Sequence, residues 1–310
     1  MKKPKIIVIG SCNTDMVVKA NHLPVPGETV VGGSFLMNPG GKGANQSIAA
    51  ARLGGDITFI AKTGEDLFAR QSIELYEAEG INTKYIFSDP KHPSGVALIS
   101  VDSHGENCII VATGANQFLS PDDIKKASKD IITSDMVLMQ LEVPIETIEF
   151  AAKLAKENNV KVILKPAPAS SLNDSIIKNL YVIVPNTVEA EILSGIKVRN
   201  METAKKAAKI ISQRGVDNVI ITLGENGAFL KEGKNYYTLA APKVEANDTT
   251  GAGDTFCGAL SVAVSEGKSL FEAVTFANMA ASITVTRIGA QAAIPYRKEI
   301  ETNLNNLKIN

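Results

Sequence analysis

The residues best suited to carry chemistry lie in one stretch near the C-terminal end, Asn247–Phe256, with the sequence NDTTGAGDTF. Gly251 and Gly253 lack a Cβ atom, so the backbone there can turn sharply and approach a ligand closely. Apolar residues recur after Phe256 at the spacing of one helix face, which predicts that a helix follows directly. The first N–H groups of such a helix have no partners within it and, together with the helix dipole, favour the binding of anions, above all phosphate.

A carboxylate lies in the middle of this predicted anion site, at Asp254. A base next to a bound phosphate group can take the proton from a hydroxyl as that hydroxyl attacks phosphorus. The alternative is that Asp254 is only an acidic residue that is favourable in the first turn of a helix. This stretch alone does not decide between the two interpretations.

A second glycine-rich loop, NPGGKGANQ at residues 38–46, opens another predicted helix that runs to about Leu53. Further polar residues follow predicted strands, where open α/β sheets place their ligand sites. A mixture of donors and acceptors of this kind suits a polyhydroxylated ligand. The polar residues that we expect to converge are Asn13, Asp15, Gly41, Lys42, Asn45 and Glu142.

The common nucleotide and hydrolase motifs are absent from the sequence. Neither glycine loop matches the P-loop or the dinucleotide-binding pattern, the three histidines have no metal-ligand spacing, and no G-x-S-x-G elbow occurs. Asn186 and Glu189 have the N-x-x-E spacing of a helix capping box. Thr222 and Gly224 follow another predicted strand and are also compatible with a plain strand exit.

The elements that must position these residues alternate between strand and helix along most of the chain, beginning with a buried strand at Lys5–Ile9. We therefore predict an α/β fold with a central, mostly parallel sheet flanked by helices on both faces. Segments at about 13–37, with a strand-like stretch through Phe35, and at 95–111 have β character and lie outside this alternation. We expect one domain over residues 1–310 into which these segments insert a small β-sheet lid.

Composition limits the function further. The chain has 310 residues and a formal net charge of −1, which gives no electrostatic case for a nucleic-acid or anionic-membrane partner. The three cysteines are widely spaced, as in a reduced protein. The apolar run near the N-terminus is too short for a secretory signal, and no run approaches the ~18 apolar residues of a membrane span. We expect a cytoplasmic protein.

The two glycine-rich stretches together resemble the PfkB carbohydrate kinases, and GGKGANQ resembles the ribokinase branch in particular. The resemblance extends over essentially the whole chain, through GSCNTD at 10–15, MQLE at 139–142, PNTVEAE at 185–191, ITLGENGA at 221–228 and TRIGAQ at 286–291. Two positions depart from the family pattern: Lys165 replaces a usual asparagine near the phosphates, and Ala293 replaces a common serine at the cation site.

The resemblance implies a role for each matching residue. Asp254 is the general base, and the N–H groups around Gly251, Ala252 and Gly253 form the anion hole for the transferring phosphoryl group. The sugar-contacting positions are Asn13, Asp15, Gly41, Lys42, Asn45, Glu142 and Asp254. The nucleotide-binding positions are Asn186, Thr222, Gly224, Gly227, Gly253 and Asn278. Glu189 is associated with Mg²⁺, and a monovalent cation is held by Asp248, Thr250, Thr284, Arg287 and Gly289.

The activity implied by the resemblance is ATP-dependent phosphorylation of D-ribose at O5 to D-ribose 5-phosphate, in ribose catabolism. It implies Mg²⁺ with ATP, K⁺ as an activator, and a homodimer formed through the β-sheet lid. One alternative is a kinase for another small sugar or a nucleoside, such as 2-deoxyribose. The other is a catalytically silent sugar-binding regulator, since a fold does not determine a function.

Overall fold

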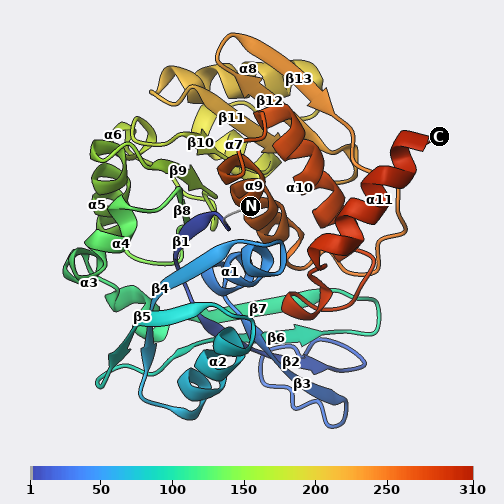
Figure 1. Ribbon diagram of the computed structural model, residues 1–310. Coiled ribbons are helices and arrows are strands. Elements are labelled where there is room, and N and C mark those ends of the chain that lie inside the picture. Colours follow the sequence, from blue (N-terminus) through green and yellow to red (C-terminus); the bar gives the residue numbers. More distant parts are fainter. Residues whose placement is uncertain (1–2, 310) are drawn as a thin grey trace.

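A large sheet occupies the centre of the protein in the computed structural model, which describes residues 3–309 (Figure 1). Its strand order is β13-β12-β11-β10-β9-β8-β1-β4-β5, and all neighbours are parallel except β11–β12 and β12–β13. The strands are β1 Lys5–Ile9, β4 Asp56–Gly64, β5 Asn82–Asp89, β8 Met136–Met139, β9 Lys161–Leu164, β10 Val182–Ile183, β11 Asn218–Thr222, β12 Ala228–Glu232 and β13 Asn235–Leu239.

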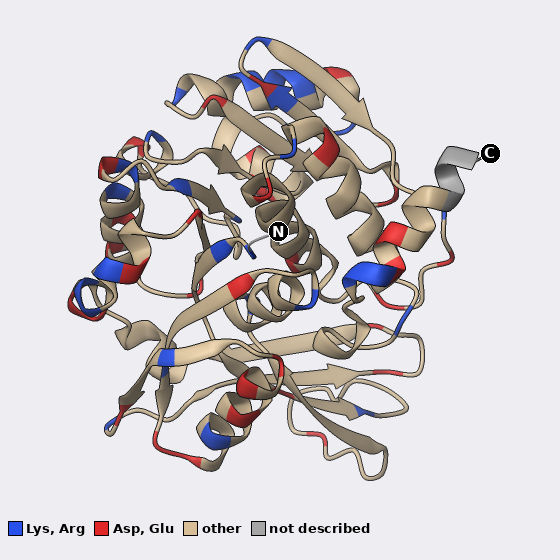
Figure 2. Ribbon diagram, viewed as in Figure 1, with Lys and Arg blue, Asp and Glu red and all other residues tan. Residues whose placement is uncertain are grey.

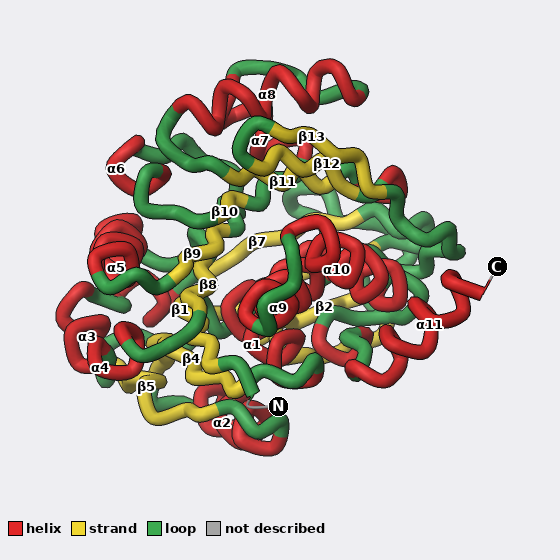
Figure 3. Tube along the Cα trace, turned by 45° about the horizontal axis from the view of Figure 1, so that its top comes forward, coloured by secondary structure: helices red, strands yellow, loops and turns green. Residues whose placement is uncertain are grey.

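Helices cover both faces of this sheet, as the turned view of Figure 3 also shows. The helices that pack into the core on one face are α1 Lys42–Arg52, α2 Leu67–Ala78, α9 Ala252–Ser265, α10 Leu270–Thr284 and α11 Arg297–Ile309. Those on the other face are α3 Pro121–Lys126, α4 Ser128–Ile132, α5 Ile145–Glu157, α6 Asp174–Ile177, α7 Thr187–Ser194 and α8 Met201–Gln213.

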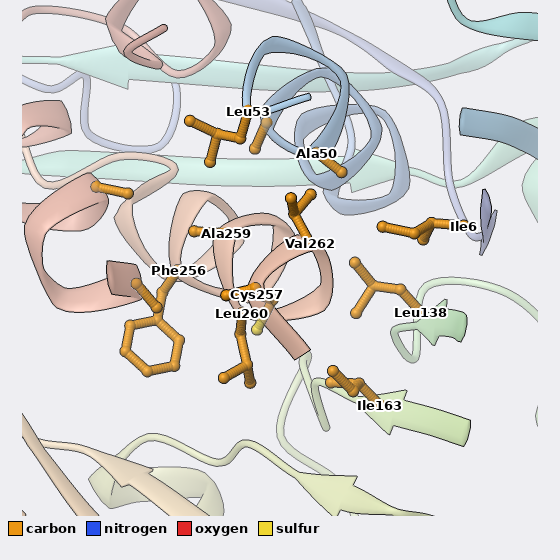
Figure 4. Packing of buried hydrophobic residues seen from close by; sticks show 14 of the residues in the cluster. Ile6, Ala50, Leu53, Leu138, Ile163, Phe256, Cys257, Ala259, Leu260 and Val262 are labelled. Atoms are coloured by element: carbon orange, nitrogen blue, oxygen red, sulfur yellow. The ribbon is translucent and has the colours of Figure 1, made fainter. Parts of the chain in front are cut away.

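The continuous apolar run of β1 explains its central position. Ile6 and Val8 belong to the core on the α9 face, whereas Ile7 and Ile9 belong to the core on the α5 face. Successive side chains of a strand point to opposite faces, so a strand covered on both sides must be apolar throughout. Figure 4 shows the α9 face, where Leu138 of β8 lies near Val262 and Leu260 of α9.

A separate small sheet lies beside the end of the large one (Figure 1). Its order is β3-β2-β6-β7, formed by β2 Asn13–Lys19, β3 Ser34–Gly40, β6 Gly95–Val101 and β7 Asn107–Ala112. The predicted strand-like stretch ending at Phe35 was wrong in position. Gly32 and Gly33 have φ angles of 105° and 107°, which interrupt an extended strand, and β3 begins after them and continues through Asn38 to Gly40.

The predicted fold class is confirmed: a large, mostly parallel sheet is flanked by helices on both faces and accompanied by a small sheet. The grouping of residues 1–310 into one domain stays a prediction. Among the helices of residues 3–309, none has the length and apolar character needed to cross a membrane.

The backbones of α1 and α9 come unusually close at Gly258. A Cβ atom added there would lie 2.6 Å from the Cβ of Ala49 and 3.0 Å from the carbonyl oxygen of Gln46. Asp254 precedes Gly258 by one helical turn, so both residues occupy the same face of α9. The close contact therefore brings the N-terminal half of α1 directly against Asp254.

We predict that Gly258→Ala destabilises the protein, although alanine is usually favoured over glycine within a helix by about 0.5–1 kcal/mol. The added methyl group must separate α1 from α9, and overpacking of this kind costs typically 1–3 kcal/mol. Urea unfolding measures the change, with Thr275→Ala on the exposed face of α10 as a control for helix propensity alone. A Gly258→Ala variant as stable as the unmodified protein would contradict the steric account.

Candidate active site

Asp254 is the buried centre of the site, with 8% of its surface exposed. Its Oδ2 accepts a hydrogen bond from Asn45 Nδ2 at 3.0 Å, and its Oδ1 accepts one from Gln46 Nε2 at 2.9 Å. Burial raises the pKa of Asp254 above its usual value, while the charge of Lys42 and the two amide donors act in the opposite direction. The donors fix the orientation of a carboxylate that is poised to accept a proton.

A second row of amide groups orients these two donors. Gln140 Nε2 donates to Gln46 Oε1 at 2.7 Å, and Gln291 Nε2 donates to Asn45 Oδ1 at 3.0 Å. All four amide side chains are buried. Because an amide that accepts through its oxygen must present its NH₂ group elsewhere, this arrangement directs both NH₂ groups at Asp254.

The predicted sugar-side residues surround Glu142, which follows β8. Glu142 Oε2 accepts hydrogen bonds from the Ser11 hydroxyl and from Lys42 N, the latter at 3.0 Å. Its Oε1 forms an ion pair with Lys42 Nζ at 3.1 Å. Gly41, with a φ angle of 89°, allows this approach, since a Cβ there would lie 2.8 Å from Asn13 N. The loop thus holds both charges of the pair at one end of the sheet.

Asn13 and Asp15 lie on β2 of the small sheet, not in a loop at the end of β1. Asn13 Oδ1 accepts a hydrogen bond from Asn116 Nδ2 at 2.8 Å. Asp15 packs against Gly40, where a Cβ would lie 2.3 Å from its carboxylate oxygens. Burial, and then the charge of Glu142, raise the pKa of Asp15 to about 6.

A cavity of about 550 Å³ adjoins Asp254 on the other side. Among its lining residues are the predicted positions Lys42, Asn186, Glu189, Thr222, Gly224, Gly251 and Gly253, together with Lys165. The structure therefore brings most of the predicted phosphate and nucleotide positions together at one cavity. Two predicted nucleotide positions, Gly227 and Asn278, do not line this cavity: Gly227 forms a turn with φ 84°, and Asn278 Nδ2 donates to Leu239 O at 3.2 Å.

Helix α9 begins with free N–H groups at this cavity. The N–H groups of Gly251, Gly253 and Asp254 have no acceptor among residues 3–309, whereas Ala252 N donates to Thr249 O at 3.3 Å. Gly251 has φ 75°, the left-handed conformation that glycine adopts most readily. Unpaired N–H groups at a helix start are donors for an anion.

The N-x-x-E residues form the capping box that their spacing predicts, and they also line the cavity. Asn186 Oδ1 accepts from Glu189 N, and Glu189 Oε2 accepts from Asn186 N, each at 2.8 Å. Glu189 Oε2 additionally forms an ion pair with Lys165. The capping interpretation and the ligand-site interpretation are therefore compatible.

The predicted cation residues lie in two segments that are held together. Asp248 Oδ1 accepts from Thr250 N and its Oδ2 accepts from Gly289 N, both at 2.9 Å. Although burial raises the pKa of Asp248, these hydrogen bonds lower it below its usual value. The side chain of Arg287 pairs with Glu299. Because a guanidinium group is positively charged and has no acceptor, Arg287 can offer a cation only its backbone carbonyl. The Thr284 hydroxyl donates to Ala280 O at 3.0 Å.

Several site residues escaped the sequence analysis. Three glutamines shape the environment of Asp254: Gln46, Gln140 and Gln291. Ser11 and Asn116 fix the sugar-side residues. Asn116 does so by accepting a hydrogen bond from Cys12 N at 2.9 Å. Four of these residues lie within the motifs GSCNTD, GGKGANQ, MQLE and TRIGAQ, so membership of a motif was a usable signal: Ser11, Gln46, Gln140 and Gln291. Asn116 lies outside these motifs, and the local sequence around Asn116 or Gln291 does not indicate their partners in the structure.

Comparison with known proteins identifies the family. Residues 3–297 match the model of the family described as "pfkB family carbohydrate kinase". The chain is 42% identical to the ribokinase of Haemophilus influenzae over 294 residues, covering 95% of this chain and 96% of that protein. It is 38% identical to the deoxyribokinase of Salmonella typhi over 291 residues, covering 94% of this chain and 95% of that one.

A solved structure gives the same relationship. The structure of Arabidopsis thaliana ribokinase complexed with ribose and ATP superposes with a TM-score of 0.90 at 32% identity, covering 98% of this chain and 99% of that one. The chain belongs to the pfkB family of carbohydrate kinases.

The raised pKa of Asp15 predicts that ionisation of this side chain makes the folded protein less stable above pH 6 than it is near pH 4. The unfolded chain ionises Asp15 near its usual value of 3.8, whereas the folded protein does so near 6, so the unmodified protein loses stability as the pH rises between these values. Asp15→Asn removes this loss. We expect the variant to be more stable at pH 7.5, by at most about 3 kcal/mol, and the gap to close near pH 4.

Urea unfolding at several pH values measures this difference, with Asp56→Asn at an exposed position of β4 as the control. A variant that is less stable at pH 7.5, or a gap that does not change with pH, would show that ionised Asp15 is not under electrostatic strain.

Proposed function

We propose that the protein is an ATP-dependent ribokinase, which phosphorylates D-ribose at O5 to give D-ribose 5-phosphate in ribose catabolism. The observation that carries this proposal is the position of Asp254. Its carboxylate stands between a group of polar side chains suited to a sugar and a cavity into which free backbone N–H groups open. The ribokinase relatives, and the neighbour whose structure contains ribose and ATP, support the choice of substrates.

On the sugar side, carboxylates accept hydrogen bonds from hydroxyl groups, and amides both accept from hydroxyl groups and donate to them. The residues that would hold ribose are Asn13, Asp15, Gly41, Lys42, Asn45 and Glu142. Asp254 would take the proton from the terminal hydroxyl as that oxygen attacks the γ-phosphorus of ATP. Asp15 and Asn13 belong to the small sheet, which would thereby act as a lid over the sugar.

On the phosphate side, the free N–H groups of Gly251, Gly253 and Asp254 would stabilise the charge of the transferring phosphoryl group. Ala252 contributes less directly, since its N–H donates to Thr249 O. Thr222, Gly224 and Asn186 would contact the nucleotide from the cavity wall. Gly227 and Asn278 do not line the cavity. They would shape the nucleotide pocket from behind its wall.

Two cations fit this chemistry. In residues 3–309, no three His, Cys, Asp or Glu side chains form a cluster that could hold a metal. Mg²⁺ keeps several waters and commonly binds through one or two carboxylates and substrate phosphates, so Glu189 at the cavity fits an ion that arrives with ATP. For K⁺, Asp248 with the backbone around Thr250, Thr284, Arg287 and Gly289 would form the site. Bound there, K⁺ would add positive charge close to the anion hole.

The alternative substrate is 2-deoxyribose, which the deoxyribokinase relative favours. The presence of Asp254 with both of its amide donors argues against a silent sugar-binding regulator. We also propose a cytoplasmic location, which suits an enzyme that uses ATP and whose three cysteines are all free.

Steady-state assays over ribose, 2-deoxyribose, other pentoses, hexoses and nucleosides test the function. The proposal requires ribose to have the highest kcat/KM and ribose 5-phosphate to be the product. A preference for 2-deoxyribose would replace the substrate and keep the mechanism. No phosphorylation of any member of the panel would overturn the proposed activity.

We predict that Asp254→Asn retains the fold and sugar binding but loses at least ~10²-fold in kcat, the usual contribution of a general base. Asparagine keeps the shape of the side chain and cannot accept the proton. Calorimetric titration with ribose reports binding, and a coupled assay reports turnover. Turnover near that of the unmodified enzyme would exclude Asp254 as the base.

We further propose that two copies associate through their small sheets. Few charged residues lie on these strands (Figure 2), and both edge strands, β3 and β7, lack a partner on their outer side within the described chain. Exposed apolar side chains gather there: Val18, Phe35, Leu36, Met37, Leu98, Ile109, Ile110 and Val111. An apolar patch of this kind indicates an interaction surface, and a two-fold axis would bring identical patches together.

Ile110 is 70% exposed, so Ile110→Asp should leave the folded monomer intact. We expect this variant to be monomeric in light scattering after size exclusion, whereas the unmodified protein is a dimer. Ile192→Asp, at an exposed apolar position on α7, is the control and should remain dimeric. A monomeric unmodified protein, or a dimeric Ile110→Asp variant, would argue against this interface.

A further inference from the structure

Lys165 follows β9 and lies at the wall of the 550 Å³ cavity with only 6% of its surface exposed. It stands next to the start of α9, since a Cβ atom added to Gly253 would lie 3.6 Å from Lys165 Cε. The side chain therefore reaches the same place as the free N–H groups of Gly253 and Asp254.

The ammonium group of Lys165 has fewer acceptors than it can use. A lysine ammonium carries three N–H donors. Within the part of the chain that the structure describes, Glu189 alone accepts from Lys165 Nζ. Buried polar groups are normally satisfied, so unused donors at a cavity wall call for a ligand or water that accepts them.

Glu189 is itself held in place and cannot follow the ammonium group elsewhere. Its Oε2 also accepts from Asn186 N in the capping box at the start of α7. The carboxylate therefore acts as a fixed anchor for Lys165. A long, flexible side chain that is fixed at its charged end by a buried carboxylate presents its remaining donors in a defined direction.

The neighbouring donors indicate the chemistry of the ligand. Lys165 Nζ, Gly251 N, Gly253 N and Asp254 N are all donors, and several of them face one cavity without an acceptor. A set of converging donors that includes a positive charge suits the oxygens of a phosphate group better than a sugar hydroxyl, which must also donate.

We propose that Lys165 binds the phosphate chain of the nucleotide, with Glu189 as the residue that positions its ammonium group. The inference rests on the proposed use of ATP. It adds a charged contact from β9 to the N–H groups of α9, so that phosphate oxygens are held from two elements of the fold.

Nucleotide binding measured by calorimetry tests the proposal without reference to turnover. Lys165→Met removes the ammonium group but leaves Glu189 unpaired beside the phosphates, which weakens binding by repulsion whether or not Lys165 contacts the ligand. The deciding variant is Lys165→Met/Glu189→Gln, which removes both charges together. It is titrated in EDTA without Mg²⁺, so that the loss of Glu189 as a proposed Mg²⁺ contact does not contribute. The control is Lys231→Met on β12, where another buried lysine contacts Asp217 O and Gly233 O.

We expect the double variant to bind ADP about 10- to 100-fold more weakly than the unmodified protein, the loss typical of one charge-assisted hydrogen bond. Adenosine, which has no phosphate, should bind both proteins equally, and Lys231→Met should bind ADP as the unmodified protein does. Lys165→Arg should retain most of the affinity for ADP.

A folded double variant that binds ADP as tightly as the unmodified protein would overturn the proposal and leave Lys165 as a counter-ion of Glu189. An equal loss for ADP and adenosine would also overturn it, because the effect would then not depend on phosphate. Failure of the unmodified protein to bind either ATP or ADP would instead refute the proposed function, on which the inference depends.

Discussion

The structure of the site depends on one close contact, between helices α1 and α9 at Gly258. Because no side chain stands between the two backbones there, α1 lies near enough for Asn45 and Gln46 to donate to both oxygens of Asp254. A buried carboxylate needs such donors, since burial alone would favour its neutral form, which is a poor base. The same packing that completes the core on one face of the sheet thus sets the chemistry of Asp254.

The two sides of the site differ in the groups that they present. The sugar side carries Asp15 and Glu142 with a single lysine, Lys42, and the pKa of Asp15 is raised first by burial and then by the charge of Glu142. The phosphate side carries free N–H donors and Lys165, whose charge is balanced by Glu189, and Lys42 also lines its cavity. In this account the sugar supplies hydroxyl donors to the carboxylates of the acidic half, and the nucleotide supplies anionic oxygens as acceptors for the N–H donors that folding leaves free.

The sequence predicted most of the fold because strands buried on both faces, such as β1, must be apolar throughout, and glycines such as Gly41 mark required turns. The positions of β3 and of the amide network were harder to predict. The start of β3 depends on two consecutive glycines with positive φ. Gln291 reaches Asn45 across 246 positions of the chain, and only the packing of α1 against the C-terminal segment creates that contact. Local patterns contain no information on such pairs.

The most direct test of the account is the pH dependence of kcat in Gln46→Met, with Gln291→Met as a control that removes an amide touching Asn45 instead of Asp254. Gln46 donates to the ionised carboxylate, so its loss should raise the pKa of Asp254. The account predicts that the acidic limb of the profile moves to higher pH in Gln46→Met and that much of the lost activity returns in alkaline solution. A uniformly lower kcat with an unchanged acidic limb would contradict it.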